Sequence, residues 1–120
     1  MKLRLRHNSI RLRLTQSEVA QLRDIGAVEE YVEFAPGHRL TYRIASNSEQ
    51  PSVTAEYRDG HISLTVPKMM VSDWAGSAQV GMESTGALRL LIEKDFSCLE
   101  PSDPEDNFDT FPNPLQGKSC

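Results

Sequence analysis

The strongest constraint on the fold of this chain is an internal repeat. When the sequence is shifted against itself by 52 positions, apolar and turn residues align without a gap. The identical pairs are Arg6 with Arg58, Ile10 with Ile62, Leu12 with Leu64, Val19 with Val71 and Val28 with Val80. Leu22 pairs with Trp74 in the same register. Matches at apolar and turn positions predict two copies of one structural unit. A chain of 120 residues is long enough for one hydrophobic core, so the copies should share it.

The first copy predicts the order β-β-α-β-β. Cations alternate with aliphatic residues over 2–6 and 10–14, which is the period of strands with one buried face. Between them, His7-Asn8-Ser9 predicts a hairpin turn. Thr15-Gln16-Ser17-Glu18 matches a capping box and predicts the start of a short helix. Two further strands are expected at about 28–34 and 40–44.

The second copy predicts the same order. Strands over 53–57 and 61–66 flank the turn Arg58-Asp59-Gly60, and Pro67 stands where Thr15 stands in the first copy. Val71 and Trp74 then occupy the apolar positions of Val19 and Leu22. The last two strands are expected at about 79–83 and 88–92. In them, Leu88, Leu90 and Ile92 occupy the positions equivalent to Leu40, Tyr42 and Ile44.

These two units predict a mostly β, α+β fold. Edge strands of the two halves should pair across a pseudo-twofold axis and close a β-barrel. One barrel domain is expected over 1–100, with halves at about 1–45 and 53–92. An irregular, acidic, proline-rich tail should follow over 101–120, either docked on the barrel or flexible.

Part of each half resembles a known family. The stretch from Ile62 to Lys68, followed by a short helix, a strand and the turn into 86–92, resembles the swapped-hairpin, AbrB-type domain. Residues 9–34 resemble it too, with Thr15 in place of the proline. The resemblance implies a fused pseudo-dimer, and DNA binding through basic residues near the first hairpin.

A second resemblance covers nearly the whole chain. The opening Lys2-Leu3-Arg4-Leu5-Arg6 and the ending with Glu93-Lys94-Asp95-Phe96-Ser97-Cys98-Leu99, Glu105-Asp106 and Phe111-Pro112-Asn113-Pro114 are similar to a family of short bacterial proteins without assigned function. This resemblance implies no activity.

The basic first hairpin is the leading candidate for a binding site. Alternation should place its cations on one outer face; they are Lys2, Arg4, Arg6, Arg11 and Arg13. Such a cluster is typical of a surface that neutralises polyanions or accepts an acidic tail. The pI of about 5.3 favours the other interpretation, a solvated or internally paired strand face.

The tail is the second candidate site. Its acidic and aromatic residues predict docking on this chain or on a partner; they are Phe96, Glu105, Asp106, Phe108, Asp109 and Phe111. One hypothesis places tail carboxylates from Glu100 to Asp109 on the arginines of the first hairpin.

No metal site, cofactor or catalytic residue is predicted. Asp103, Glu105, Asn107 and Asp109 alternate as in a calcium loop, but Phe108 and Pro114 stand where glycine and glutamate are needed. Cys98 and Cys120 are the remaining metal candidates, and they lie far apart in the sequence. No motif of a known catalytic class occurs, so the chain is not expected to be an enzyme.

These observations favour a small cytoplasmic binding module that acts through protein contacts, as a monomer or weak dimer. We expect the cytoplasm because the sequence has only two cysteines, no signal-peptide pattern and no apolar run of membrane-spanning length. The alternative is a nucleic-acid-binding regulator of the AbrB kind, and the third hypothesis is a small-molecule enzyme or sensor.

Overall fold

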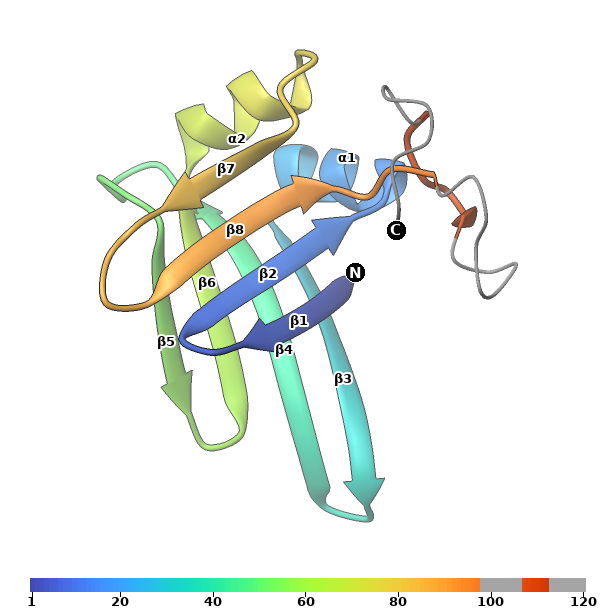
Figure 1. Cartoon of the computed structure of the whole chain (residues 1–120), viewed down its shortest axis with the longest axis vertical. Coiled ribbons are helices and arrows are strands. Elements are labelled where there is room, and N and C mark those ends of the chain that lie inside the picture. The colour runs from blue at the N-terminus through green and yellow to red at the C-terminus, as the bar shows by residue number, and fades with distance from the viewer. Residues whose placement is uncertain (98–106, 113–120) are drawn as a thin grey trace.

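The computed structural model describes residues 1–97 and 107–112, and its element order confirms the predicted repeat (Figure 1). The first half contains β1 (Lys2–Arg6), β2 (Ser9–Leu14), α1 (Gln16–Asp24), β3 (Ala27–Ala35) and β4 (His38–Asn47). The second contains β5 (Thr54–Arg58), β6 (His61–Pro67), α2 (Lys68–Ala75), β7 (Gly81–Ser84) and β8 (Arg89–Lys94). Each half is therefore β-β-α-β-β.

The strands form two four-stranded sheets, and each sheet takes one hairpin from each half. Sheet A has the order β1-β2-β8-β7, and sheet B has the order β3-β4-β6-β5. In both sheets the hairpins join through a central parallel pair, β2 with β8 and β4 with β6. Ile10 lies opposite Leu90 in sheet A, and Ile62 lies opposite Tyr42 in sheet B. The register thus confirms that Leu90 and Tyr42 are equivalent.

The expected closed barrel is wrong. No strand pairing joins sheet A to sheet B over residues 1–97 and 107–112; the sheets instead face each other across a shared core. Both helices contact strands of both sheets, α1 reaching β2 and β4, and α2 reaching β6 and β7. Bulky side chains between two sheets keep their edges apart, and such sheets pack as layers.

Equivalent core positions are filled by different side chains. Leu22 on α1 and Trp74 on α2 are both fully buried, as the repeat predicted. The predicted equivalence of Val28 and Val80 is wrong, because Val28 lies opposite Ile44 and Met82 lies opposite Ile92. Val80 is 43% exposed, since the connection from Ala75 to Gly81 is longer than that from Asp24 to Ala27.

Local signals for helix and turns are confirmed. The Glu18 carboxylate accepts the Thr15 N–H at 2.9 Å, which completes the capping box of α1. His7 and Asp59 have positive φ at equivalent places in the β1–β2 and β5–β6 turns. Gly60 follows with φ of 76°, and a Cβ there would meet the Arg39 carbonyl at 2.9 Å, so this turn requires glycine.

Candidate functional site: a basic face on sheet A

The cations of the first hairpin do share one face of sheet A. The antiparallel register of β1 and β2 places Arg4 opposite Arg11 and Lys2 opposite Arg13. The parallel pairing of β2 with β8 then sets Arg89 opposite Ser9, beside this cluster. We call this surface the basic face; it comprises Lys2, Arg4, Arg6, Arg11, Arg13 and Arg89.

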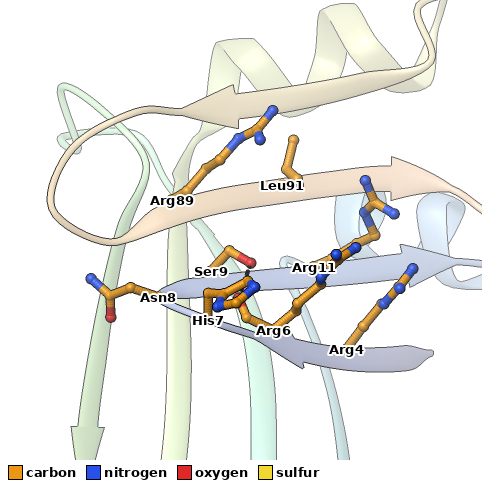
Figure 2. Close-up of a pocket in the computed structure, with 8 residues that line it drawn as sticks. All are labelled: Arg4, Arg6, His7, Asn8, Ser9, Arg11, Arg89 and Leu91. Carbon is orange, nitrogen blue, oxygen red and sulfur yellow. Dashed lines mark hydrogen bonds between the residues drawn. The ribbon is translucent and has the colours of Figure 1, made fainter.

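The end of the basic face nearest the β1–β2 turn is hollowed. A pocket of about 390 Å³ is lined by Arg4, Arg6, His7, Asn8, Ser9, Arg11, Arg89 and Leu91. Figure 2 shows Arg4, Arg6 and Arg11 along β1 and β2, with Arg89 across from them on β8. Four guanidinium groups around one hollow form a candidate site for an anion.

Hydrogen bonds fix the turn that carries this hollow. The Arg89 N–H donates to the Asn8 carbonyl at 3.0 Å, and the Asn8 side-chain amide donates to the Ala87 carbonyl. The Ser9 hydroxyl donates to the Arg6 carbonyl at 2.5 Å. The β1–β2 turn is thereby tied to the start of β8, which holds Arg6 and Arg89 on one rigid surface.

Acids of the same sheet pair with two of the six cations of the basic face. Arg11 Nε lies 3.0 Å from Glu93 Oε1, and Arg89 Nε lies 3.1 Å from Glu83 Oε1. The Arg11 contact lacks the alignment of a hydrogen bond, and no other described residue accepts a hydrogen bond from Arg11 Nε.

The remaining cations differ in their pairing. Lys2 Nζ lies 2.9 Å from Asp95 Oδ2. Within residues 1–97 and 107–112, Arg4, Arg6 and Arg13 form no ion pair. These three guanidinium groups carry the positive charge of the face.

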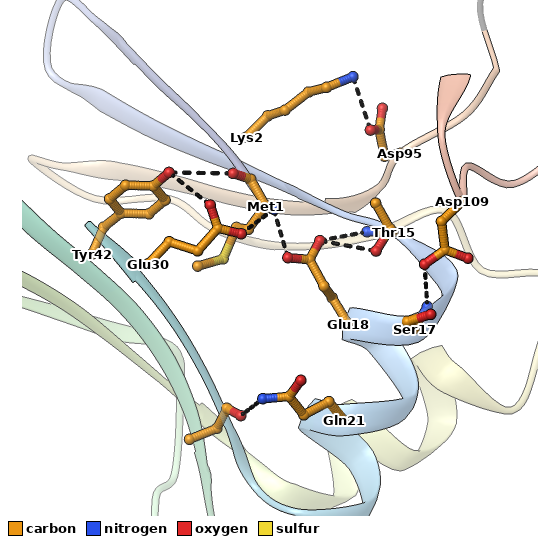
Figure 3. A network of polar contacts seen from close by, with 11 residues as sticks. Met1, Lys2, Thr15, Ser17, Glu18, Gln21, Glu30, Tyr42, Asp95 and Asp109 are labelled. Carbon is orange, nitrogen blue, oxygen red and sulfur yellow. Dashed lines mark hydrogen bonds and ion pairs between the residues drawn. The ribbon is translucent and has the colours of Figure 1, made fainter. Parts of the chain in front are cut away.

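The described part of the tail docks at the start of α1 and beside the residues that follow β8. Asp109 Oδ2 accepts the Ser17 N–H at 3.0 Å at the start of α1 (Figure 3). Hydrogen bonds from the side chain and backbone of Ser17 lower the pKa of the Asp109 carboxyl. The Phe111 N–H donates to the Asp95 carbonyl at 2.8 Å, and the Phe96 and Phe111 rings lie 6.0 Å apart. Phe108 is 79% exposed.

Tail contact with the hairpin arginines is therefore not made by Asp109. Acids within or just after β8, Glu93 and Asp95, reach the basic face instead. The docking candidates Glu105 and Asp106 lie outside the described residues, as do the metal candidates Cys98 and Cys120. Within the described part of the chain, no group of three His, Cys, Asp or Glu side chains could hold a metal ion.

A cluster around the N-terminal ammonium was missed by the sequence analysis. Met1 N lies 2.5 Å from both Glu18 Oε2 and Glu30 Oε1, and the Tyr42 hydroxyl donates to Glu30 Oε2 at 3.1 Å (Figure 3). Burial and the nearby Glu30 charge raise the pKa of Tyr42 to about 12. The residues converge from the N-terminus and three separate elements, and nothing in their spacing indicates the contact.

Arg89 was also missed, although a signal existed. Its alternation with the buried residues Leu90 and Ile92 assigns it to the outer face of its strand. Only the pairing of β8 with β2 brings Arg89 to the hairpin cations, and that pairing joins the two halves.

The family of the chain follows from a comparison over nearly its full length. Residues 1–115 match the sequence model of a family described as "Family of unknown function (DUF7009)". The chain belongs to this family. The DUF7009 match includes the whole basic face, both helices and the described tail segment. No curated protein and no solved structure matches the chain significantly. None of the helices in the described part is long and apolar enough to cross a membrane.

Proposed function

We propose that this chain is a small binding module whose basic face binds an acidic segment of a protein partner. The observation that carries the proposal is the hollow lined by Arg4, Arg6, Arg11 and Arg89 on a rigid turn. Guanidinium groups in such an array recognise carboxylates in a directional, bidentate manner. A rigid site also loses little conformational entropy on binding.

The internal repeat supplies a comparison within the same molecule. The positions of sheet B that correspond to the basic face hold Thr54, Glu56, Arg58, Ser63, Thr65 and Thr41. Only Arg58 among them is a cation, yet sheet B forms the same strand order and register pattern. The cations of sheet A are therefore not required by the fold, which supports a role in binding.

The acids on the same face favour a short acidic segment over a long polyanion. Glu83 and Glu93 lie beside Arg89 and Arg11, so a duplex crossing the whole sheet would bring phosphates against carboxylates. The net charge of −4 opposes nonspecific binding to nucleic acid as well. A few carboxylates placed over Arg4, Arg6 and Arg13 avoid the repulsion by Glu83 and Glu93, and a short segment meets little repulsion from the net charge.

Nucleic-acid binding is the second candidate. Six cations on one sheet face support it. The AbrB-type character of each half stays a prediction. The location in the cytoplasm stays a prediction, as does the third hypothesis of a small-molecule enzyme or sensor.

Fluorescence anisotropy with two labelled probes distinguishes the first two candidates. The probes are a peptide rich in Glu and Asp and a short DNA duplex, each titrated at low and at moderate salt. We expect the peptide to bind and the double variant Arg4→Gln/Arg6→Gln to weaken that binding about tenfold or more. The matched control is Arg58→Gln, the counterpart of Arg6 on sheet B, which should bind as the wild type does.

Each result decides between the candidates. Tight duplex binding with a steep salt dependence, lost in the double variant, would favour the nucleic-acid regulator. Absence of binding to both probes, or equal effects of the double variant and Arg58→Gln, would reject the basic face as a binding site.

A further inference from the structure

The two sheets differ in length, and the described residues close the space between them at one end only. The strands of sheet B have 9, 10, 7 and 5 residues in spatial order, whereas those of sheet A have 5, 6, 6 and 4. Both helices lie at the end where β2 and β6 finish. At the opposite end the β3–β4 hairpin extends past sheet A (Figure 1).

The open end exposes apolar side chains that belong to the inner faces. A groove of about 400 Å³ is lined by Leu5, Ile10, Leu40, Ala55, Glu56, Tyr57, Ile62 and Leu88. Leu5 is 57% exposed and Tyr57 is 71% exposed, although their strand neighbours Ile10 and Ile62 are buried. A sheet with an apolar face is stable only when another layer covers it, and this region has none within the described residues.

An apolar ridge stands next to this groove. Val32 lies opposite Leu40, a residue of the groove, and is 44% exposed. Phe34 lies at the bulge between Glu33 and Ala35 and is 75% exposed. We call Val32 and Phe34 the ridge. Ridge and groove form one continuous surface through Leu40.

The ridge is also where the repeat breaks down. The equivalent strand in the second half, β7, has 4 residues against 9 in β3, so it has no counterpart of the projecting hairpin. The additional residues of β3 do not complete the core of their own chain, because Tyr31, Val32 and Phe34 are all at least 44% exposed. Large exposed apolar patches mark interaction sites.

We propose that the open end is the interface of a homodimer, in which the ridge of each copy lies in the groove of the other. A twofold axis requires a self-complementary surface, and this one offers a projecting and a hollow apolar part side by side on the same copy. The charges beside the ridge fit this arrangement too. Glu33 adjoins the ridge and is paired with Arg39 of its own copy at 3.0 Å, so the ridge can enter an apolar groove without an unpaired acid beside it.

Sedimentation velocity of the full chain over a wide range of concentration tests the dimer. We expect a reversible monomer–dimer equilibrium in the wild type. Phe34→Ser on the ridge and Tyr57→Ser in the groove should each raise the dimer dissociation constant about tenfold or more. Met69→Ser is the matched control, since Met69 lies on α2 and is 79% exposed; it should leave the dissociation constant unchanged.

Mixing the two variants tests the pairing of ridge with groove. A heterodimer of Phe34→Ser with Tyr57→Ser keeps one intact contact, from the Phe34 of one copy to the Tyr57 of the other. The equimolar mixture should therefore associate more tightly than either variant alone. Far-UV circular dichroism confirms that each variant is folded, and Val32→Ser serves as a second ridge variant.

Three outcomes would overturn the proposal. They are a wild type that stays monomeric at every concentration, a dimer that Met69→Ser weakens as much as Phe34→Ser does, and a mixture that associates no better than its components. A monomer that binds an apolar fluorescent probe, with Tyr57→Ser abolishing that binding, would assign the groove to a small apolar ligand instead.

Discussion

At the scale of single residues, the N-terminal ammonium joins three elements. Glu18 belongs to α1, Glu30 to β3 and Tyr42 to β4, and the first two lie within 2.5 Å of Met1 N. Burial lowers the pKa of the ammonium, but the hydrogen bonds to Glu18 and Glu30 outweigh burial and raise the pKa overall. Burial raises the pKa of Glu18, but its bonds to the ammonium and to Thr15 outweigh that effect and lower it overall.

These opposite shifts predict a stability maximum between them. The contribution of Glu18 is present above its ordinary pKa of 4.5 and is lost as pH falls through its lowered folded value. The contribution of the ammonium is present below 8.0 and is lost as pH rises through its raised folded value. Glu18→Gln keeps a side chain that can complete the capping box but removes the charge. It should lower the free energy of unfolding at neutral pH by about 1–2 kcal/mol. The further decrease of this free energy as the pH falls should be smaller than in the wild type.

Urea unfolding across the pH range measures this effect. Glu49→Gln, an exposed position in the connection from β4 to β5, is the control and should follow the wild-type curve. Parallel pH profiles for wild type and Glu18→Gln would show that the ammonium cluster does not contribute to stability.

At the scale of elements, the two helices hold equivalent places with different side chains. Trp74 is fully buried and its Nε1–H donates to the Val80 carbonyl at 3.0 Å, whereas Leu22 fills the matching site without a polar atom. The longer connection before β7 supplies the acceptor for the indole. One unit thus accommodates either residue when its neighbouring loop adapts.

Trp74→Ala should therefore be far more destabilising than Trp74→Leu. The alanine variant leaves a large cavity and should lower the free energy of unfolding by about 3–5 kcal/mol. Leucine restores part of the apolar volume, and we expect it to recover a clear share of that loss. Because Trp74 is the only tryptophan, far-UV circular dichroism in urea is the appropriate measurement. Equal losses for both variants would contradict the equivalence of the two sites.

The contact of the tail with α1 makes a separate prediction. Asp109→Ala removes the acceptor of the Ser17 N–H, so amide hydrogen exchange at Ser17 should become faster. Phe108→Ala, one residue away on an exposed side chain, is the control and should leave that exchange rate unchanged. A Ser17 exchange rate unaffected by Asp109→Ala would argue against tail docking at α1.

Local signals predicted the elements, whereas long-range contacts decided the layers and the sites. The capping box at Thr15 and the turns at His7 and Asp59 depend on neighbouring residues, so the sequence was sufficient for them. The choice between barrel and layered sheets depends on how side chains such as Trp74 fill the interior. Asp109 lies 92 residues from Ser17, and Met1 lies 29 from Glu30, so no local pattern could reveal either contact.

At the scale of the whole molecule, the two proposed surfaces are distinct. The basic face lies on the outer side of sheet A, and the ridge and groove lie at the open end between the sheets. They meet only at the β1–β2 turn, where Arg6 and His7 follow Leu5. A dimer formed through the open end would therefore present two basic faces, which raises the effective affinity for a partner with repeated acidic segments.

The exchange of hairpins between the halves also determines when the chain can fold. Sheet A is incomplete until β8, ending at Lys94, pairs with β2, and sheet B is incomplete until β6 pairs with β4. Neither half contains a complete sheet, so part of the inner face of each half stays uncovered until the other half is added. The entropy of closing such long loops is lost before the strand pairs form, and this slows folding. During synthesis, the first half must wait until β8 has been made, with its apolar strands open to capture by a chaperone.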